Sequence, residues 1–348
     1  MHGPELIITN FNPRHTGVSS TAAAVARVQM GRFDLALAGH PLPGLPKPLG
    51  RLQAVRLSRM PPAARPFVIW HVRRNSEMQT AIVLRDLFRF PVRIVFTSAA
   101  QRRHSAWPHW LISRMDAVIA TTQEAASFVP NVAAIVPHGV DTGSFRPAPD
   151  RMAAWAATGF PGRGGIASVG RIRPEKGTDL FVRAMIAALP DLPGMTALVI
   201  GRAKPEHRRF LERLKGEVGA AGLSGRILFP GEIDAARMTS LVPALSLLVA
   251  LPRYEGYGLT PLEAMASGVP VVASDAGHFR AFIGRNEAGR IVAQEDVTAA
   301  EMAVREILSD PACHQGLSDA ARRRVEQGFS VKTEADAIAR VYEMLWRA

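Results

Sequence analysis

Two glutamates stand on either side of a glycine-containing turn in the stretch PRYEGYGLTPLE, residues 252–263. Glu255 precedes the turn and Glu263 follows it. If a helix begins near Thr260, with Glu263 in its first turn, its free amides and its dipole favour an anion at the turn. A ligand with phosphate in its middle and a hydroxyl-bearing ring at each end fits this layout, and a nucleotide sugar has that form. Taken singly, Glu263 could instead complement the helix dipole and Glu255 could be a surface residue.

A second stretch, GRIRPEKG at residues 170–177, places two cations in one strand-to-helix connection. Arg171 and Lys176 together would neutralise a diphosphate, the arginine as a planar fork and the lysine as a point charge. The alternative is a solvated basic turn. The chain has neither the GxxxxGK[ST] pattern of a Walker loop nor the GxGxxG of a dinucleotide fold, which counts against an ATPase and a dehydrogenase.

A third loop, PRHTGVSST at residues 13–21, follows the first apolar run. Its Gly17 precedes a Ser/Thr-rich helix start whose free amides could face a phosphate. An ordinary strand-to-helix turn, capped by Ser or Thr, explains the same residues.

These loops need elements that bring them together. Short apolar runs bounded by turns recur along the chain, and segments of helical periodicity separate most of them; the runs are ELIITNF, FDLALAG, PFVIWHV, VRIVFTS, DAVIATT and AAIVPHG, then GIASVGR, TALVIGR, RILFPGE, LSLLVAL and PVVASDAG. This alternation predicts an α/β fold of two doubly wound, Rossmann-like domains with parallel sheets, facing each other across a cleft. We place the boundary at 148/149, beside the proline-bearing linker 143–150, and expect residues 331–348 to form a final helix.

Length and composition agree with two domains. The chain has 348 residues, 47% of them hydrophobic, and a single cysteine, Cys313, which favours a reducing, cytoplasmic location. We find no secretory signal and no apolar stretch of the roughly 18 to 20 residues that spanning a bilayer needs. We therefore expect a protein that can sit on a membrane surface without crossing it.

The formal charge of +12 is unevenly distributed. Residues 1–150 hold 17 Lys and Arg against 8 Asp and Glu, whereas residues 151–348 hold 25 against 22. An arginine-rich composition, with only five lysines, explains part of the total but not the asymmetry. The basic first half favours an anionic partner: acidic lipid headgroups, a phosphorylated glycolipid or nucleic acid.

Several of these motifs together resemble the family 4 retaining glycosyltransferases. EGYGLTPLE is similar to their E-x7-E element, followed by AMASGVPVVAS; GRIRPEKG resembles their G-R-x-x-x-E-K-G loop, IVPHGVDTGSFRP their interdomain stretch, and ILFPGEI their strand and turn near the base. The similarity covers nearly the whole chain. It implies a GT-B architecture with the nucleotide-sugar donor in domain 149–330 and the acceptor in domain 1–148, to which the helix 331–348 crosses back.

The resemblance also implies roles for individual residues. It assigns Arg171 and Lys176 to the donor diphosphate, Glu263 to the ribose, and Glu255 to the transferred sugar and distal phosphate. The amides of the turn assist Glu255, and they belong to Gly256, Tyr257, Gly258, Leu259 and Thr260.

Four further positions complete the predicted site. Gly17 would close on the phosphate, Ile233 and Glu232 would lie near the base, and His71 would lie beside the donor sugar, with Glu255, Arg171 and Lys176 as the other catalytic residues. Relatives often read H-E-P after this strand, whereas this chain reads HVRRN, and a histidine that caps a strand end is the competing interpretation.

Within the family, the WHVRRN segment is similar to bacterial lipopolysaccharide core mannosyltransferases, which use GDP-mannose. That likeness implies an anionic glycolipid acceptor at the inner-membrane surface. The arginines that would bind it are Arg73, Arg74, Arg102 and Arg103, for which a solvated surface is the alternative.

The implied reaction is a front-face substitution in which the leaving phosphate helps to take the acceptor proton and Glu255 orients the sugar. The loop cations would supply the charge that a metal otherwise brings, so we expect no metal and no other cofactor. The rival enzymes are a sugar-nucleotide epimerase or phosphorylase on the same fold. A non-catalytic basic module for membranes or nucleic acid is the third possibility; the basic stretches lack interleaved aromatic residues, so we expect no nucleic-acid partner.

Overall fold

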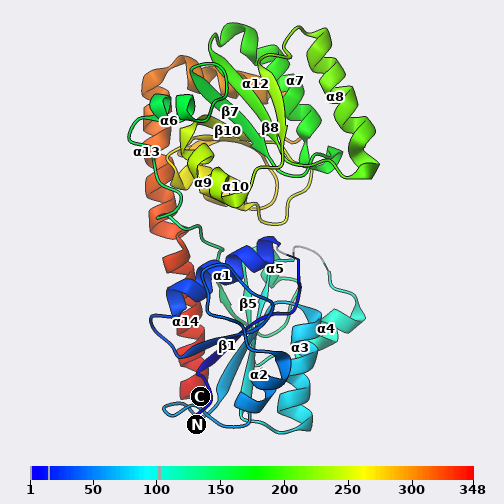
Figure 1. Cartoon of the computed structure of the whole chain (residues 1–348), viewed down its shortest axis with the longest axis vertical. Helices are drawn as coiled ribbons and strands as arrows, with labels where there is room; N and C mark the ends of the chain where they lie inside the picture. The colour runs from blue at the N-terminus through cyan, green and yellow to red at the C-terminus, as the bar shows by residue number, and fades with distance from the viewer. Residues whose placement is uncertain (1, 15, 101–102) are drawn as a thin grey trace. The chain divides into compact units, whose positions relative to one another are not determined.

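The computed structural model describes residues 2–14, 16–100 and 103–348, and it divides the chain into two compact units. Unit 1 consists of residues 1–139 and 330–348, and unit 2 of residues 140–329 (Figure 1). Each unit is an α/β domain built on a six-stranded sheet whose recorded strand pairs are all parallel. The predicted fold class is confirmed.

The sheet of unit 1 has the strand order β2-β1-β3-β4-β5-β6. Its strands are β1 (Leu6–Asn10), β2 (Leu35–Gly39), β3 (Val68–Val72), β4 (Val92–Ser98), β5 (Ala117–Ala120) and β6 (Val132–Ile135). Its helices are α1 (Gly17–Gln29), α2 (Arg51–Leu57), α3 (Asn75–Ile82) with the π-helical turn η1 (Val83–Leu87), α4 (Ala106–Ser113), α5 (Gln123–Ala126) and α14 (Val331–Arg347). The strand order reverses between β1 and β3, so the loops after these two strands diverge there.

Both faces of this sheet are covered, which explains its nearly continuous apolar strands. On one face, Met78 of α3 and Leu111 of α4 join a core with Trp70 of β3. On the other face, Val25 of α1 and Tyr342 of α14 lie in a second core. The predicted final helix is therefore α14, and it packs on unit 1, as the resemblance implied.

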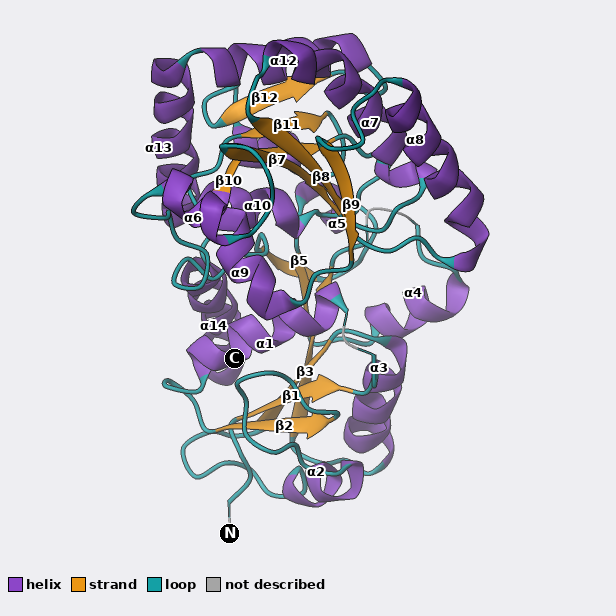
Figure 2. Ribbon diagram, turned by 45° about the horizontal axis from the view of Figure 1, so that its top comes forward, coloured by secondary structure: helices purple, strands orange, loops and turns teal. Residues whose placement is uncertain are grey.

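Unit 2 has the strand order β12-β11-β10-β7-β8-β9. Its strands are β7 (Gly164–Val169), β8 (Met195–Ile200), β9 (Ile227–Gly231), β10 (Leu245–Ala250), β11 (Val271–Ser274) and β12 (Gly289–Val292). Its helices are α6 (Arg151–Ala157), α7 (Thr178–Ala188), α8 (Arg208–Ala220), α9 (Ala235–Ala244), α10 (Leu259–Ala266), α11 (Phe279–Ile283), α12 (Val297–Ser309) and α13 (Pro311–Gly328), with short 3-10 turns η2 (Pro174–Lys176), η3 (Leu189–Asp191) and η4 (Pro205–His207). Figure 2 shows these helices on both sides of the orange strands.

The boundary between the units falls at Gly139, earlier than the predicted 148/149. The proline-bearing segment packs on unit 2, because the Arg322 guanidinium of α13 donates to the carbonyl oxygens of Thr142 and Phe145. The segment 143–150 thus belongs to unit 2, where Arg322 binds it at Phe145. Among the described residues, no helix combines the length and the apolar character needed to cross a bilayer.

Candidate active site

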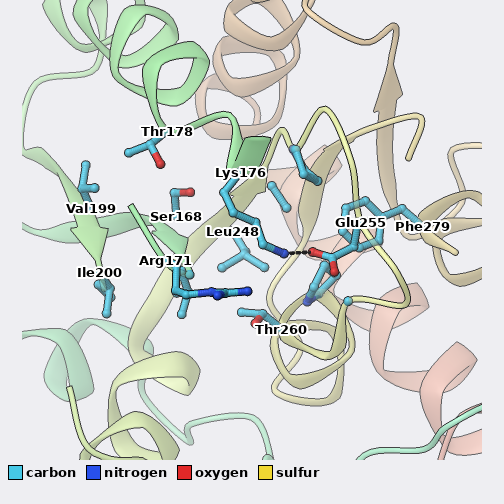
Figure 3. A pocket seen from close by; sticks show the side chains of 16 residues that line it. Ser168, Arg171, Lys176, Thr178, Val199, Ile200, Leu248, Glu255, Thr260 and Phe279 are labelled. Atoms are coloured by element: carbon cyan, nitrogen blue, oxygen red, sulfur yellow. Dashed lines mark hydrogen bonds and ion pairs between the residues drawn. The ribbon is translucent and has the colours of Figure 1, made fainter. Parts of the chain in front are cut away.

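A hollow lies in unit 2 at the point where the order of its strands reverses. The chain runs from β7 outward to β9 and then returns to β10 on the other side of β7. The loops after β7 and β10 therefore leave the sheet in opposite directions, and ligands of open α/β sheets bind in such a crevice. Residues of both loops line the hollow, among them Arg171, Lys176, Glu255 and Thr260 (Figure 3).

Two glycines allow these loops to approach each other closely. Gly177 has φ +64°, and a Cβ there would lie 1.7 Å from the carbonyl oxygen of Leu251. Gly258 has φ +83°, and its Cβ would lie 2.3 Å from Cε1 of Phe279. A side chain at either position would force the two walls of the hollow apart.

Lys176 and Glu255 form an ion pair across the hollow. The Lys176 Nζ lies 2.5 Å from Glu255 Oε2, and the other carboxylate oxygen accepts a hydrogen bond from the Gly256 amide at 3.0 Å. Both side chains are only partly exposed. The contact fixes the direction of the carboxylate and leaves further donors on the ammonium group for a ligand.

Arg253 also links the loop that carries Lys176 to the loop that carries Glu255. Its guanidinium binds Asp179 of α7 in a bidentate pair, with both N···O distances 2.9 Å, and it donates to the Pro174 carbonyl at 2.5 Å. It also pairs with Glu295, and its backbone amide donates to the Glu175 carbonyl at 3.0 Å. Arg253 thus holds the loop of Lys176 against the loop of Glu255.

The Asp179 carboxylate is the buried partner in this brace. Burial alone would raise the pKa of Asp179, but the hydrogen bonds and charge of Arg253 outweigh burial and lower that pKa below its usual range. Asp179 and Arg253 are therefore both ionised near neutral pH, and loss of either residue would break the link between the two loops.

Arg171 provides the uncompensated positive charge. It is exposed, it has no carboxylate partner within the described part of the chain, and it points into the hollow (Figure 3). A neighbouring hollow shares Arg171 and continues along Arg202, Glu232 and Ile233. The residues predicted to bind the diphosphate and those predicted to lie near the base thus line two adjoining hollows.

Helix α10 begins at Leu259, near Thr260 as predicted, with the left-handed Gly258 as its N-cap. Glu263 consequently lies in the second turn and not in the first. It is half-buried, and removal of its carboxylate from water raises its pKa to about 7. Gly258 and Thr260 line the hollow, whereas Gly256, Tyr257, Leu259 and Glu263 are not among its lining residues.

In unit 1, a buried carboxylate organises the loops after β1 and β3. Glu77 is fully buried and accepts hydrogen bonds from the amides of Phe11 and Arg73, at 3.0 and 2.8 Å, and from the Thr9 hydroxyl at 2.9 Å. Arg74 donates to Glu77 at 3.1 Å. Arg74 also donates to the Asn10 side chain at the end of β1 and to the Thr16 and Ser19 side chains at the start of α1.

The arginines predicted to bind an acceptor therefore differ in availability. Arg74 is committed to the loop before Gly17, the first residue of α1. Arg73 is half-buried, and its Nε and Nη1 atoms have no hydrogen-bond partner within the described ranges. Arg103 is exposed, and Arg102 lies outside the described residues.

His71 is buried in unit 1. It lies inside β3 with no exposed area, and its ring nitrogens contact the Tyr342 hydroxyl at 2.5 Å and the Thr97 hydroxyl at 2.7 Å. Burial, assisted by the positive charge of Arg73, lowers the pKa of His71 well below its ordinary value. In this placement Tyr342 of α14 covers the ring, and the role of His71 beside the donor sugar stays a prediction.

Comparison with known proteins agrees with this geometry. Residues 158–324 match the family model described as glycosyl transferases group 1. The chain is 45% identical over 345 residues to the lipopolysaccharide core biosynthesis mannosyltransferase LpcC of Rhizobium leguminosarum bv. viciae, covering 98% of this chain and 96% of that protein.

The chain belongs to the group 1 glycosyl transferases. It is also 45% identical over 351 residues to the lipopolysaccharide core biosynthesis mannosyltransferase LpsB of Rhizobium meliloti, covering 99% and 98% of the two chains. The crystal structure of Anabaena HepE in complex with UDP and glucose matches its fold with a TM-score of 0.79 at 15% identity, over 97% of this chain and 99% of that one. The GT-B fold type is therefore confirmed.

The sequence analysis missed two residues that position the site of this glycosyl transferase. Arg253 stands two residues before Glu255 in the same stretch, but its partners Asp179 and Glu295 are distant in sequence. Glu77 follows the double arginine at a spacing of three residues from Arg74, which is the only signal that could have revealed their ion pair. Within the described ranges, no three His, Cys, Asp or Glu side chains are grouped as metal ligands.

Proposed function

We propose that this glycosyl transferase is a retaining mannosyltransferase of lipopolysaccharide core assembly, which moves mannose from GDP-mannose to an anionic glycolipid at the cytoplasmic face of the inner membrane. Two relatives that are 45% identical over nearly the full chain carry the name lipopolysaccharide core biosynthesis mannosyltransferase. The basic first half of the chain, with 17 Lys and Arg against 8 Asp and Glu, suits an acceptor that bears phosphates or acidic sugars.

The ion pair of Lys176 with Glu255, beside the uncompensated Arg171, is the observation that carries this proposal. In the reaction, the bond between the mannose anomeric carbon and the GDP oxygen breaks. A bond to the acceptor oxygen forms on the same face, and the acceptor proton passes to the leaving diphosphate. Negative charge grows on that diphosphate, so Arg171 and Lys176 stabilise the transition state more than the ground state.

In this scheme Glu255 orients the mannose that is transferred. Its carboxylate is held by Lys176 and by the Gly256 amide, so it is available as a fixed acceptor for sugar hydroxyls. It does not need to act as a nucleophile, and neither a metal nor another cofactor takes part in the proposed steps.

The preference for guanine rests on Glu232. Its exposed carboxylate lines the hollow next to Arg171, and its ion pair with Arg202 is long at 3.8 Å. Guanine presents two adjacent N–H donors to a carboxylate, whereas uracil presents one. A carboxylate at this position therefore favours GDP over UDP.

Thermal-shift measurements with GDP-mannose, UDP-glucose, ADP-glucose and the free nucleotides test the donor, because a ligand stabilises the native state according to its occupancy. We expect the largest shift with GDP-mannose. Turnover with a lipopolysaccharide core acceptor, followed by NMR of the new linkage, should give an α-mannoside. Epimerised or hydrolysed donor without acceptor, or a larger shift with a UDP-sugar, would overturn the proposal.

A further inference from the structure

One face of unit 1 exposes large apolar side chains that its core does not use. Helices α3 and α4 lie beside each other on the same face of the sheet (Figure 1), and both contribute residues to the core beneath them. The residues of α4, η1 and the following turn that point away from this core include Leu87, Phe88, Trp107 and Trp110, which are 71, 57, 53 and 48% exposed. We call these four side chains the apolar patch.

The two tryptophans form the most distinctive part of the patch. Trp107 and Trp110 are one helical turn apart on α4, and their rings stack with centroids 5.1 Å apart at an interplanar angle of 12°. Indole rings are large and apolar but carry one N–H donor, so they favour the boundary between lipid and water. The fold does not require them at this position, because Leu111 and Ile112 already fill the core side of α4.

The stretch of sequence that carries the patch is predominantly basic. Residues 83–116 contain six arginines and two aspartates and no lysine or glutamate. Both aspartates are occupied, Asp86 by Arg85 and Arg114 and Asp116 by Arg85.

Two arginines near the patch remain available for an anionic partner. Arg89 and Arg103 have no acidic partner within the described part of the chain, and Arg103 lines a hollow with His104 and His109 beside α4. Arg103 precedes Trp107 by four residues, and Arg89 directly follows Phe88. Cations beside exposed apolar side chains suit phosphate-bearing headgroups above an apolar layer.

We propose that the apolar patch and the adjoining arginines are the surface on which this protein docks to an anionic lipid bilayer. The identification of the bilayer with the inner membrane rests on the proposed function, but the docking itself does not. The patch would enter only the interfacial region, as amphipathic helices do, while Arg89 and Arg103 would meet lipid phosphates.

The distribution of tryptophans makes a direct test possible. Of the five tryptophans, Trp70, Trp155 and Trp346 are buried, at 0, 1 and 7% exposure. A blue shift of the fluorescence on adding vesicles of phosphatidylcholine and phosphatidylglycerol should therefore come from Trp107 and Trp110. We expect the shift, and quenching by brominated lipid, with these vesicles and not with phosphatidylcholine alone.

Vesicle flotation of the full-length protein completes the test. The double variant Trp107→Ala/Trp110→Ala should lose about tenfold or more in vesicle affinity. The matched control is Met344→Ala on α14, which removes a side chain of 49% exposure from the opposite face of the unit 1 sheet and should leave affinity unchanged. Equal flotation of the double variant and the control would overturn the docking surface.

Two further measurements separate this proposal from the proposed function. Vesicle flotation does not depend on turnover, so its result tests the docking surface even if the proposed substrates are wrong. Turnover of a deacylated, water-soluble acceptor should be unchanged in Trp107→Ala/Trp110→Ala, whereas turnover of the acceptor in vesicles should fall. If instead soluble oligosaccharide shifts the fluorescence and vesicles do not, the tryptophans bind sugar and the docking proposal is wrong.

Discussion

Lys176 Nζ and Glu255 Oε2 lie 2.5 Å apart, although the two residues are 79 positions apart in the chain. The contact joins the loop after β7 to the loop after β10 at the point where the strand order reverses. Each charge holds the other at the mouth of the hollow before any ligand binds. A site arranged in this way needs little reorganisation when charge develops on a leaving phosphate.

Replacing Lys176 by alanine should lower kcat/KM by about 100- to 1,000-fold, because the variant loses a positive charge that acts on the departing diphosphate. The loss should appear mainly in kcat. Steady-state kinetics with saturating acceptor measure kcat and the KM for the donor.

The matched control for this variant is Lys215→Ala. Lys215 is exposed on α8 and pairs with Glu212 at 2.9 Å, so its removal tests the loss of a surface ion pair alone. We expect the control to retain wild-type kinetics. Normal turnover of Lys176→Ala would contradict the assignment of Lys176 to the diphosphate.

The conservative variant Arg253→Lys should raise the KM for the donor about tenfold, since an ammonium group cannot reproduce the bidentate contact with Asp179 that keeps the two loops together. The free energy of unfolding should fall by about 2 kcal/mol, because the buried Asp179 carboxylate loses a hydrogen bond to a charged donor. Arg290→Lys, which alters the ion pair with Glu306, is the control in the same unit. A KM equal to that of the control would show that the brace does not position the site.

The sequence predicted the elements better than the contacts between them. Parallel strands could be recognised from apolar runs, and Arg171, Lys176 and Glu255 could be placed in one site because the loops that follow parallel strands meet at one edge of a sheet. The burial of His71 could not be predicted, since it depends on Tyr342, which stands 271 positions away. The start of α10 was predicted to within one residue, but the left-handed N-cap Gly258 begins the helix early enough to move Glu263 out of its first turn.

The raised pKa of Glu263 predicts a pH-dependent stability. In the folded protein this carboxyl stays protonated up to a pKa of about 7, whereas in the unfolded chain it ionises at its ordinary value near 4.5. Its favourable contribution is therefore complete below the unfolded pKa and is lost as the pH rises through about 7. Glu263→Gln should remove this dependence.

Thermal unfolding of wild type and Glu263→Gln at a series of pH values measures the effect. The free energy of unfolding of the variant, minus that of the wild type, should rise by on the order of 3 kcal/mol between acidic and mildly alkaline pH. The reason is that one pKa unit corresponds to about 1.4 kcal/mol. The exposed Glu212→Gln serves as the control and should follow the wild type at every pH. Parallel pH profiles for wild type and Glu263→Gln would show that the carboxyl is ionised in the folded state.

Glu77→Gln tests the buried network that orders the loops of unit 1. The carboxylate accepts hydrogen bonds at both oxygens from the amides of Phe11 and Arg73 and from the Arg74 guanidinium, so an amide nitrogen at either position would face a donor. The variant should lose about 2 to 4 kcal/mol of stability, because Arg74 is left without its buried counter-charge. Hydrogen exchange should accelerate at the Phe11 and Arg73 amides in particular. Glu124→Gln, on an exposed turn of α5, should leave both observables unchanged, and unaltered exchange in Glu77→Gln would mean that Asn10, Thr16 and Ser19 alone hold the loop.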